Sequence, residues 1–198
     1  MAGVGMLHVV AALITSHADG SAPVYSPGFS VGPGVAADIT FQTADNPDMG
    51  DDVVIDNDNG VTGYTGTMEN NYIEEEVAAK LYGWKQSGSG SSVEYVITDA
   101  PSPYLGFGYL KKCLDNGVVK YRAFWYLKAQ IQIGSYMNGR TKPRNGVEWQ
   151  HDTSNITGHG VIVDATGEIH FVIPKTFTTR AAAEAWLDDK AGIKAATT

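Results

Sequence analysis

The chain has 198 residues, 43% of them hydrophobic, and a formal net charge of -8 at pH 7. This length allows one well-cored domain and is short for two, and a single cysteine, Cys113, excludes an internal disulfide framework. Residues 1–79 contain twelve Asp or Glu and no Lys or Arg, whereas residues 80–198 contain fourteen Lys or Arg and ten acids. The acidic half argues against a protein that wraps nucleic acid, and the asymmetry suits copies that associate through opposite potentials.

The N-terminal residues 1–30 begin with the apolar run MAGVGMLHVVAALITS. A secretion signal would have Lys or Arg before its apolar run, and this run has none. It is also too short to span a membrane. We therefore expect residues 1–30 to form a strand or a docking arm.

The stretch VVIDNDNGVTGYTG, Val53 to Gly66, contains four Asp or Asn residues in a row before a glycine. A calcium loop needs oxygen ligands at its first, third and fifth positions, a glycine at the sixth and a glutamate at the twelfth. Registers that start at Asp56 or Asp58 each fail this pattern, and the flanking residues favour strands. We predict no metal site here, but a hairpin that turns at Asn59-Gly60.

Turn signals separate further β-rich runs. We predict one hairpin over Leu105–Leu127, closed at Asn116-Gly117, and another over Gly160–Pro174, closed by Ala165-Thr166. Cys113 is expected to be a half-buried strand residue. Residues 134–146 form the longest candidate loop, with Arg140, Lys142 and Arg144 along it.

Two helices interrupt the strands. The first, in NNYIEEEVAAKLYGW, is expected to start with a cap at Asn70 or Asn71, to end before Gly83 and to bury Ile73, Val77 and Leu81. The second covers residues 178–192, with a stripe of Ala182, Ala183, Trp186 and Leu187. The predicted fold class is mainly β: a β-sandwich or barrel-like domain with one packed α-helix and a C-terminal helix.

Residues that would support catalysis do not group in the sequence. The five histidines, His8, His17, His151, His159 and His170, form no metal-binding spacing, and there is no GxSxG motif or phosphate-binding loop. Gly106-Phe107-Gly108 lacks the third glycine of a dinucleotide loop. We expect no enzyme activity, no catalytic residue, no metal and no cofactor.

One pattern rises above this background. Polar and apolar residues alternate in VAADITFQT (Val35–Thr43), AQIQI (Ala129–Ile133) and VEWQHD (Val147–Asp152), as in strands with a core face and a wet face. The wet faces carry acids and amides without Lys or Arg, which suits a surface that must not adhere to a polyanion. Their residues are Asp38, Gln42, Gln130, Gln132, Glu148, Gln150 and Asp152.

The order of segments resembles the major tail proteins of long-tailed bacteriophages, the tail tube proteins of the phi13 type. The likeness covers most of the chain and runs through GVGMLHVVAALI, PGVAADITF, IDNDNG, TGYTGTMENN, KLYGW, YLGFGYL, VKYRAFWYLKAQI and VEWQHDTSNITGHGVI. The chain departs from the family in its lack of basic residues near the N-terminus and in its alanine-rich C-terminal helix. The role of that helix is therefore left open.

The resemblance implies one β-sandwich domain, 1–198, that assembles as hexameric rings stacked into a tail tube. Inner strands of six copies would close into one barrel around the channel that genomic DNA crosses, without specific binding. The implied partners are copies of the chain, a tape measure protein and a tail terminator, and no membrane is involved. The implied location is the virion, and the host cytoplasm during assembly.

On this interpretation the inner strands are Val35–Thr43, Val61–Met68, Ala129–Ile133 and Val147–Asp152, and the seven polar residues named above line the channel. The charge asymmetry adds a prediction that Arg140, Lys142 and Arg144 contact acidic residues such as Asp56 and Asp58 of a neighbour. Two alternatives stay open. One is a tail terminator or connector subunit, and the other is a secreted carbohydrate-binding sandwich with Trp84, Trp125 or Trp149 as its sugar platform.

Overall fold

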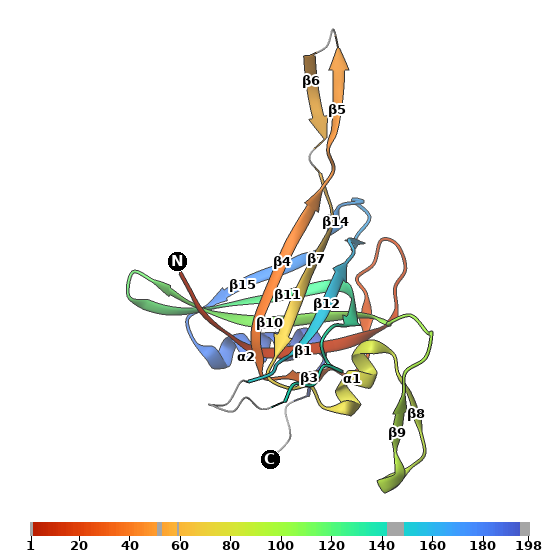
Figure 1. Cartoon of the computed structure of the whole chain (residues 1–198). Coiled ribbons are helices and arrows are strands. Elements are labelled where there is room, and N and C mark those ends of the chain that lie inside the picture. Colours follow the sequence, from red (N-terminus) through yellow and green to blue (C-terminus); the bar gives the residue numbers. More distant parts are fainter. Residues whose placement is uncertain (1, 51–52, 59, 142–148, 195–198) are drawn as a thin grey trace.

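The computed structural model describes residues 2–50, 53–58, 60–141 and 149–194 (Figure 1). The protein is mainly β, as predicted, with a large antiparallel sheet of nine strands. The strand order is β2-β1-β10-β11-β12-β7-β4, with β15 also paired to β11 and β3 to β1. The strands are β1 (Ala2–Ser16), β2 (Val24–Tyr25), β3 (Phe29–Gly32), β4 (Gly34–Thr43), β5 (Asn46–Gly50), β6 (Val53–Asp58), β7 (Val61–Asn70), β8 (Lys85–Ser87), β9 (Glu94–Val96), β10 (Tyr104–Asp115), β11 (Val118–Ile133), β12 (Asp152–Gly158), β13 (Val161–Ile162), β14 (Ile169–His170) and β15 (Val172–Phe177); the helices are α1 (Glu75–Tyr82) and α2 (Arg180–Ala191).

The long strand β11 belongs to both layers of the sandwich. Residues 121–126 pair with β15 on one side and with β10 on the other, whereas residues 129–133 pair with β12. A register shift opposite Leu105 and Phe107 separates the two parts. Bulges of this kind bend a strand, so β11 can leave the β1-β10-β15 layer and enter the β12-β7-β4 layer.

The main core lies between these two layers. Tyr64 of β7 and Ile156 of β12 pack in one cluster with Val9 of β1, and the rings of Phe107 and Tyr126 stack at 4.6 Å between their centroids. Burial of such large aromatic side chains dominates core energetics, since each removes much apolar area from water. The core of the predicted β-sandwich therefore lies between the apolar faces of its two layers.

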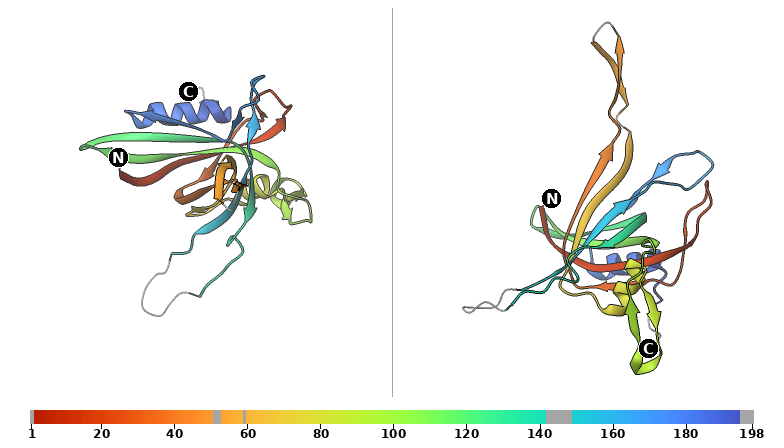
Figure 2. Two further views of the ribbon diagram at one scale, coloured as in Figure 1. Left: turned by 90° about the horizontal axis from the view of Figure 1, so that it is seen from above. Right: turned by 45° about the vertical axis from the view of Figure 1, so that its right-hand side comes forward.

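Helix α2 covers the outer side of the β1-β10-β11 layer and builds a second core (Figure 2). Thr179 caps its start, since the Thr179 hydroxyl accepts from the Ala182 N–H at 3.4 Å, and Gly192 ends it in the left-handed conformation. Ala183 and Leu187 are buried, as predicted, whereas Trp186 is partly buried and Ala182 is exposed. The buried stripe of α2 is narrower than predicted. It still packs on the sheet, because small alanine side chains let the helix lie close to the strands.

Helix α1 starts later than predicted. It begins at Glu75, and Asn70 is instead the buried last residue of β7, where its Nδ2 donates to the Gly32 carbonyl at 3.4 Å. The predicted cap at Asn70 or Asn71 is wrong because β7 continues to Asn70 and the residue at the N-cap position of α1 is Glu74. The predicted end at Gly83 and the burial of Ile73 and Leu81 are confirmed, whereas Val77 is only partly buried.

The predicted hairpin at Asn59-Gly60 is wrong, because the strands on its two sides, β6 and β7, do not pair with each other; Asn59 itself lies outside the described residues. The chain runs outward through β4 and β5, reverses between Gly50 and Val53, and returns through β6 and β7. Gly60 lies on this returning side, where its carbonyl accepts from the Ala44 N–H at 2.8 Å. Pairing of the long β-forming flanks outweighs the local preference of Asn-Gly for a turn. The β5–β6 pair, called the arm below, projects beyond the rest of the sheet (Figures 1 and 2).

The other hairpins agree with the sequence. Asn116 and Gly117 turn with positive φ between β10 and β11, as a tight hairpin requires. Val161 pairs with His170 across the turn that holds Ala165-Thr166. Residues 2–30 contain β1, β2 and the start of β3, so the expected strand is present, and Cys113 is a buried residue of β10.

Candidate functional site

Four strand segments, β4, β7, β12 and the end of β11, present one continuous polar face. In one cross-strand row Asp38 opposes Thr67, Thr67 opposes Asn155, and Asn155 opposes Gln132. In the next row Thr40, Thr65, Thr157 and Gln130 follow each other in the same way. Directly opposed residues of antiparallel strands lie on the same side of a sheet. We call the side chains of these two rows the polar face.

The opposite side of the same strands is the main core. The alternate rows contain Ala37, Met68 and Ser154, and then Ile39, Gly66, Ile156 and Ile131. Because side chains alternate along a strand, burial of these rows forces the polar rows outward. The core thus fixes the register on which the polar face depends.

The structure brings together four of the seven predicted channel-lining residues. Asp38, Gln130 and Gln132 are members of the polar face, and Gln42 continues its side of β4 beyond Thr40. The Gln130 side chain is partly held, since its Nε2 donates to the Ser102 carbonyl at 2.8 Å. The threonines of β7 and residues 153–158 of β12 were not among the predicted residues.

β12 was missed because the segment DTSNITG contains Asn and Gly, which are depleted in strands. Its period of two was the available signal: Thr153, Asn155 and Thr157 face one way, and Ser154 and Ile156 are buried. The predicted strand over Val147–Asp152 is wrong in its described part, since residues 149–151 are not in a strand and β12 starts at Asp152. Glu148 lies outside the described residues.

The other two predicted residues do not join the polar face. The Asp152 carboxylate accepts from the Ile73 N–H at 2.8 Å, on the side of the sheet where Ser154 is buried. Asp152 therefore positions the segment that leads into α1. Gln150 lies in a loop and exchanges two hydrogen bonds with the backbone of Arg140, at 3.2 and 3.1 Å.

Charge on the polar face is confined to its margins. Asp38 ends one row at β4, and Glu69, further along β7, binds His151 at 2.6 Å. Lys128, the next side chain along β11 on the side of Gln130, places its ammonium 4.7 Å from the centre of the Tyr104 ring. Both rows are therefore free of Lys and Arg, as expected, but Lys128 lies immediately beyond them on β11. Burial and the Lys128 charge lower the pKa of the neighbouring His159.

Two tyrosine hydroxyls bond to the backbone of β11 just before the polar face. The Tyr64 hydroxyl donates to the Lys128 carbonyl at 3.1 Å, and the Tyr25 hydroxyl donates to the Leu127 carbonyl at 2.7 Å. These bonds satisfy carbonyls at the point where β11 bends. Burial raises the pKa of Tyr25 to about 12 and raises the pKa of Tyr64 further, so both are neutral donors at ordinary pH.

The predicted contact residues lie apart from the polar face. Asp56 and Asp58 belong to β6, in the arm, where they oppose Asp48 and Asn46. Arg140 is exposed in the loop that follows β11. Lys142 and Arg144 are outside the described residues, so the pairing predicted for this basic loop stays a prediction.

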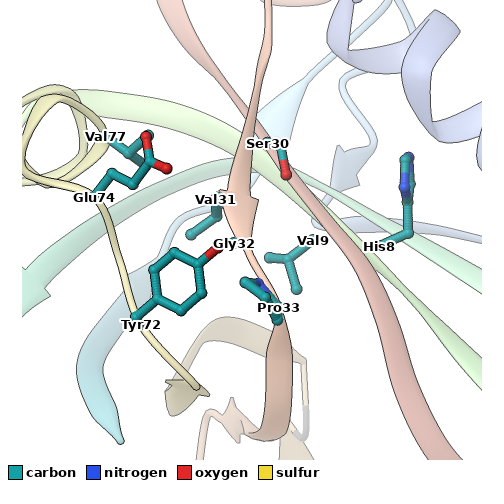
Figure 3. Close-up of a pocket in the computed structure, with 9 residues that line it drawn as sticks. All are labelled: His8, Val9, Ser30, Val31, Gly32, Pro33, Tyr72, Glu74 and Val77. Carbon is teal, nitrogen blue, oxygen red and sulfur yellow. The ribbon is translucent and has the colours of Figure 1, made fainter.

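A separate hollow of about 440 Å³ lies where β1, β3 and the segment before α1 meet (Figure 3). In Figure 3, His8 is on one side of β3, and Tyr72 and Glu74 are on the other. The His8 ring is engaged elsewhere, with its Nε2 2.8 Å from Asp188 of α2. This contact ties α2 to β1 and leaves no acid and base converging in the hollow. Within the described ranges, no group of three or more His, Cys, Asp or Glu side chains is placed to hold a metal ion.

The tryptophans named for a sugar platform do not form one surface. Trp125 is 1% exposed, whereas Trp149 is 78% exposed. Trp84 is partly buried and packs against Tyr82 and Tyr136. Trp149 alone of the three is open to a ligand.

Comparison with known proteins gives no family. A scan against models of protein families finds no match, and a search of curated proteins finds none either. Among the described residues, neither helix has the length and apolarity needed to cross a membrane. The polar face and the edges of the sheet that carries it are the features of the described residues that bear on function.

Proposed function

We propose that the chain is a structural virion subunit, the tail tube subunit of a long-tailed bacteriophage, whose copies close into stacked rings with the polar face toward the DNA channel. The observation that carries the proposal is the continuous threonine and amide surface of β4, β7, β12 and the end of β11. Such a surface offers hydrogen bonds to water and no cation to phosphate over both rows. Passing DNA would meet little to retain it.

The edges of this four-stranded segment support closure by identical copies. Among the described strands, β4 pairs with β7 alone, and residues 131–133 of β11 pair with β12 alone. Open edges of this length favour pairing with another chain. Neighbouring strands of the four are antiparallel, so β4 runs opposite to β11. A second copy can therefore add its β11 beside β4 as one more antiparallel strand. When copies repeat this pairing around an axis and the ring closes, the β4 edge and the β11 edge of every copy are paired.

Covalent capture of neighbours in solution tests this closure. Thr40→Cys and Gln132→Cys place thiols on the two edge strands, and Cys113→Ser removes the native thiol. We expect a short bismaleimide to produce a series of covalent oligomers that ends at six. A control with Thr40→Cys and Asp99→Cys, which keeps one edge thiol, should give no such series. Capture of the control pair alone, or an open series without an end, would contradict the ring.

Electron microscopy of the concentrated, purified protein then separates the tube from its alternatives. Stacked rings or tubes support the proposal. Rings that never elongate would favour a tail terminator or connector. Dispersed monomers at all concentrations would contradict both.

A further inference from the structure

The turn of the β10–β11 hairpin carries exposed apolar side chains. Val118 is 57% exposed, and the directly opposed residues Leu114 and Val119 are exposed as well. Lys112 lies on the same side of the hairpin as this pair, two residues before Leu114. Neighbouring exposed apolar side chains are typical of a surface that a protein partner covers. We call these four side chains the hairpin tip.

A second hollow, of about 530 Å³, lies where the connection between β1 and β2, the start of β7 and β14 meet. Its lining is partly apolar: Val61 and Ile169 are exposed, Ile169 to 54%, and Phe171 also takes part. A pocket for a small molecule encloses most of its ligand, whereas exposed apolar walls suit the side chains of another protein. We call this feature the receiving hollow.

The receiving hollow offers acids to an incoming cation. Asp19 lines it, and Glu168, directly before Ile169, is exposed. Lys128 lines it too, but its ammonium lies against the Tyr104 ring, 4.7 Å from the ring centre. Apolar walls beside acids therefore complement the hairpin tip, which combines three apolar side chains with one cation.

The hairpin tip and the receiving hollow lie on opposite sides of the subunit. The β10–β11 turn extends past β4 beside the N-terminus, whereas β14 and the connection between β1 and β2 lie toward the other side of the sheet, and the views agree on this (Figures 1 and 2). One subunit therefore cannot make this contact with itself. A contact between two different surfaces of identical chains is heterologous, and it generates a ring when the rotation closes.

The placement of the two features agrees with the direction of ring closure. In the proposed ring, the next copy adds its β11 end beside β4, on the side past which the β10–β11 turn extends. That copy presents the side where its β12 and the end of its β11 lie. The same side carries its receiving hollow, so the turn of the first copy points toward it.

We infer that the hairpin tip of one subunit docks in the receiving hollow of a second copy. Leu114 and Val119 cover the apolar walls, and Lys112 meets Asp19. The inference rests on the proposed function for the ring, and it deepens that function by naming a second contact between neighbours besides the β4–β11 pairing.

Sedimentation velocity tests the apolar part of the contact. Leu114→Ser with Val119→Ser should lower the apparent association constant about tenfold, because the contact then buries less apolar area. Val96→Ser with Ile97→Ser changes an exposed apolar pair at β9 and should associate like the unchanged protein. Thermal unfolding confirms that each variant is folded. Equal weakening by the two pairs, or by neither, would overturn the inference.

A charge exchange tests the polar part. Lys112→Glu and, in a separate chain, Asp19→Lys should each weaken self-association about fivefold. A 1:1 mixture of the two variants should restore it, because opposite charges again meet at every contact. Lys85→Glu and Asp99→Lys are the matched controls for net charge and should associate like the unchanged protein. If the mixture does not recover, Lys112 and Asp19 do not meet, and the inference is wrong.

Cross-linking keeps the inference separate from the proposed function. In a Cys113→Ser background, chains with Val118→Cys and chains with Ile169→Cys are mixed under mild oxidation. We expect about tenfold more heterodimer than when Val96→Cys, at a valine that is 47% exposed, replaces Val118→Cys, since a contact raises the effective concentration of its thiols. Heterodimer without rings or tubes would leave the docking contact standing and contradict the tail tube. Rings or tubes with equal cross-linking at Val118 and Val96 would leave the tail tube standing and overturn the docking contact.

Discussion

The two ends of β11 have opposite surface chemistry although one strand carries both. Near its start, Lys120 and Arg122 belong to a basic hairpin, whereas Gln130 and Gln132 near its end belong to the polar face. The register shift between them lets the same strand contribute to two layers. The placement of charge along the strand, rather than the net charge of the chain, separates a basic surface from an uncharged polar one.

The two layers also differ in what holds them. The polar face rests on the main core, in which Tyr64 and Tyr126 are buried, and the basic end of β10 and β11 rests partly on α2. Trp125 belongs to the second core, where it packs in one cluster with Leu187 of α2 and meets the Tyr25 ring edge-on at 5.4 Å. Its removal should disturb the packing of α2 on the β1-β10-β11 layer.

The largest expected effect is that of Trp125→Ala. A buried aromatic side chain replaced by alanine costs about 3–5 kcal/mol in the free energy of unfolding, since it leaves a cavity as well as losing apolar burial. Trp149→Ala, on the exposed tryptophan, should stay within about 0.5 kcal/mol. Denaturant unfolding of the two variants measures the difference. Equal losses would show that burial of Trp125 in the second core does not stabilise the fold.

A smaller loss is expected for Asp152→Ala. This change removes the acceptor of the Ile73 N–H and should cost about 1–3 kcal/mol, because a partly buried donor is left without its bond. Asp38→Ala on the exposed face should cost no more than about 0.5 kcal/mol. Denaturant unfolding of the two variants measures how much more the Asp152 carboxylate contributes to stability than the Asp38 carboxylate. A larger loss at Asp38 would reverse their assigned roles.

A lysine row across the polar face changes DNA binding with little effect on stability. Asp38→Lys, Asn155→Lys and Gln132→Lys lie in one cross-strand row and face water. Each lysine that neutralises a phosphate adds about 0.9 to the magnitude of the salt slope for duplex DNA. Virions with this row should retain DNA at low salt and eject it poorly.

The control for this row places lysines at Asp99, Gln86 and Ser87, with the same change in net charge on the β8–β9 side. It should eject DNA normally. Intact tails are checked by microscopy in both cases. Normal ejection by the lysine row would mean that this face does not line the path.

The smallest expected effect is a pH dependence from His159. Its pKa is lowered in the folded state by burial and by Lys128, so folding favours the neutral ring. Stability should therefore fall as the pH decreases below the ordinary histidine value of about 6.5, because the unfolded chain takes up the proton first. His159→Gln should flatten this part of the stability curve between pH 7.5 and 5.5. Identical stability curves for the unchanged protein and His159→Gln would show that His159 does not cause the pH dependence.

Much of the fold could be read from local signals in the sequence. The turn at Asn116-Gly117 and part of each helix stripe, with Leu81 in α1 and Leu187 in α2, are decided by residues within a few positions, and these predictions are confirmed. The turn at Asn59-Gly60 failed because long-range pairing with β4 and β5 decides where the chain reverses. Likewise, Asn70 has the chemistry of a helix cap but ends a strand.

The polar face could be read only in part. Alternation identified Asp38, Gln130 and Gln132, since a period of two is visible in one strand. It could not show that β12 lies between β11 and β7, because strand order depends on contacts distant in the sequence. For the same reason Asp152, which alternates like its neighbours, gave no sign of its bond to Ile73.

The most direct test of the account is a reconstruction of the assembled protein by electron cryomicroscopy that resolves individual strands. The account predicts a closed lumen to which each subunit contributes β4, β7, β12 and the end of β11, with β4 beside the next subunit's β11. The row from Asp38 to Gln132 should face the lumen, and α2 should lie outside. A lumen lined by α2 or by the β1-β10-β15 layer, or rings whose β4 edges stay open, would contradict it.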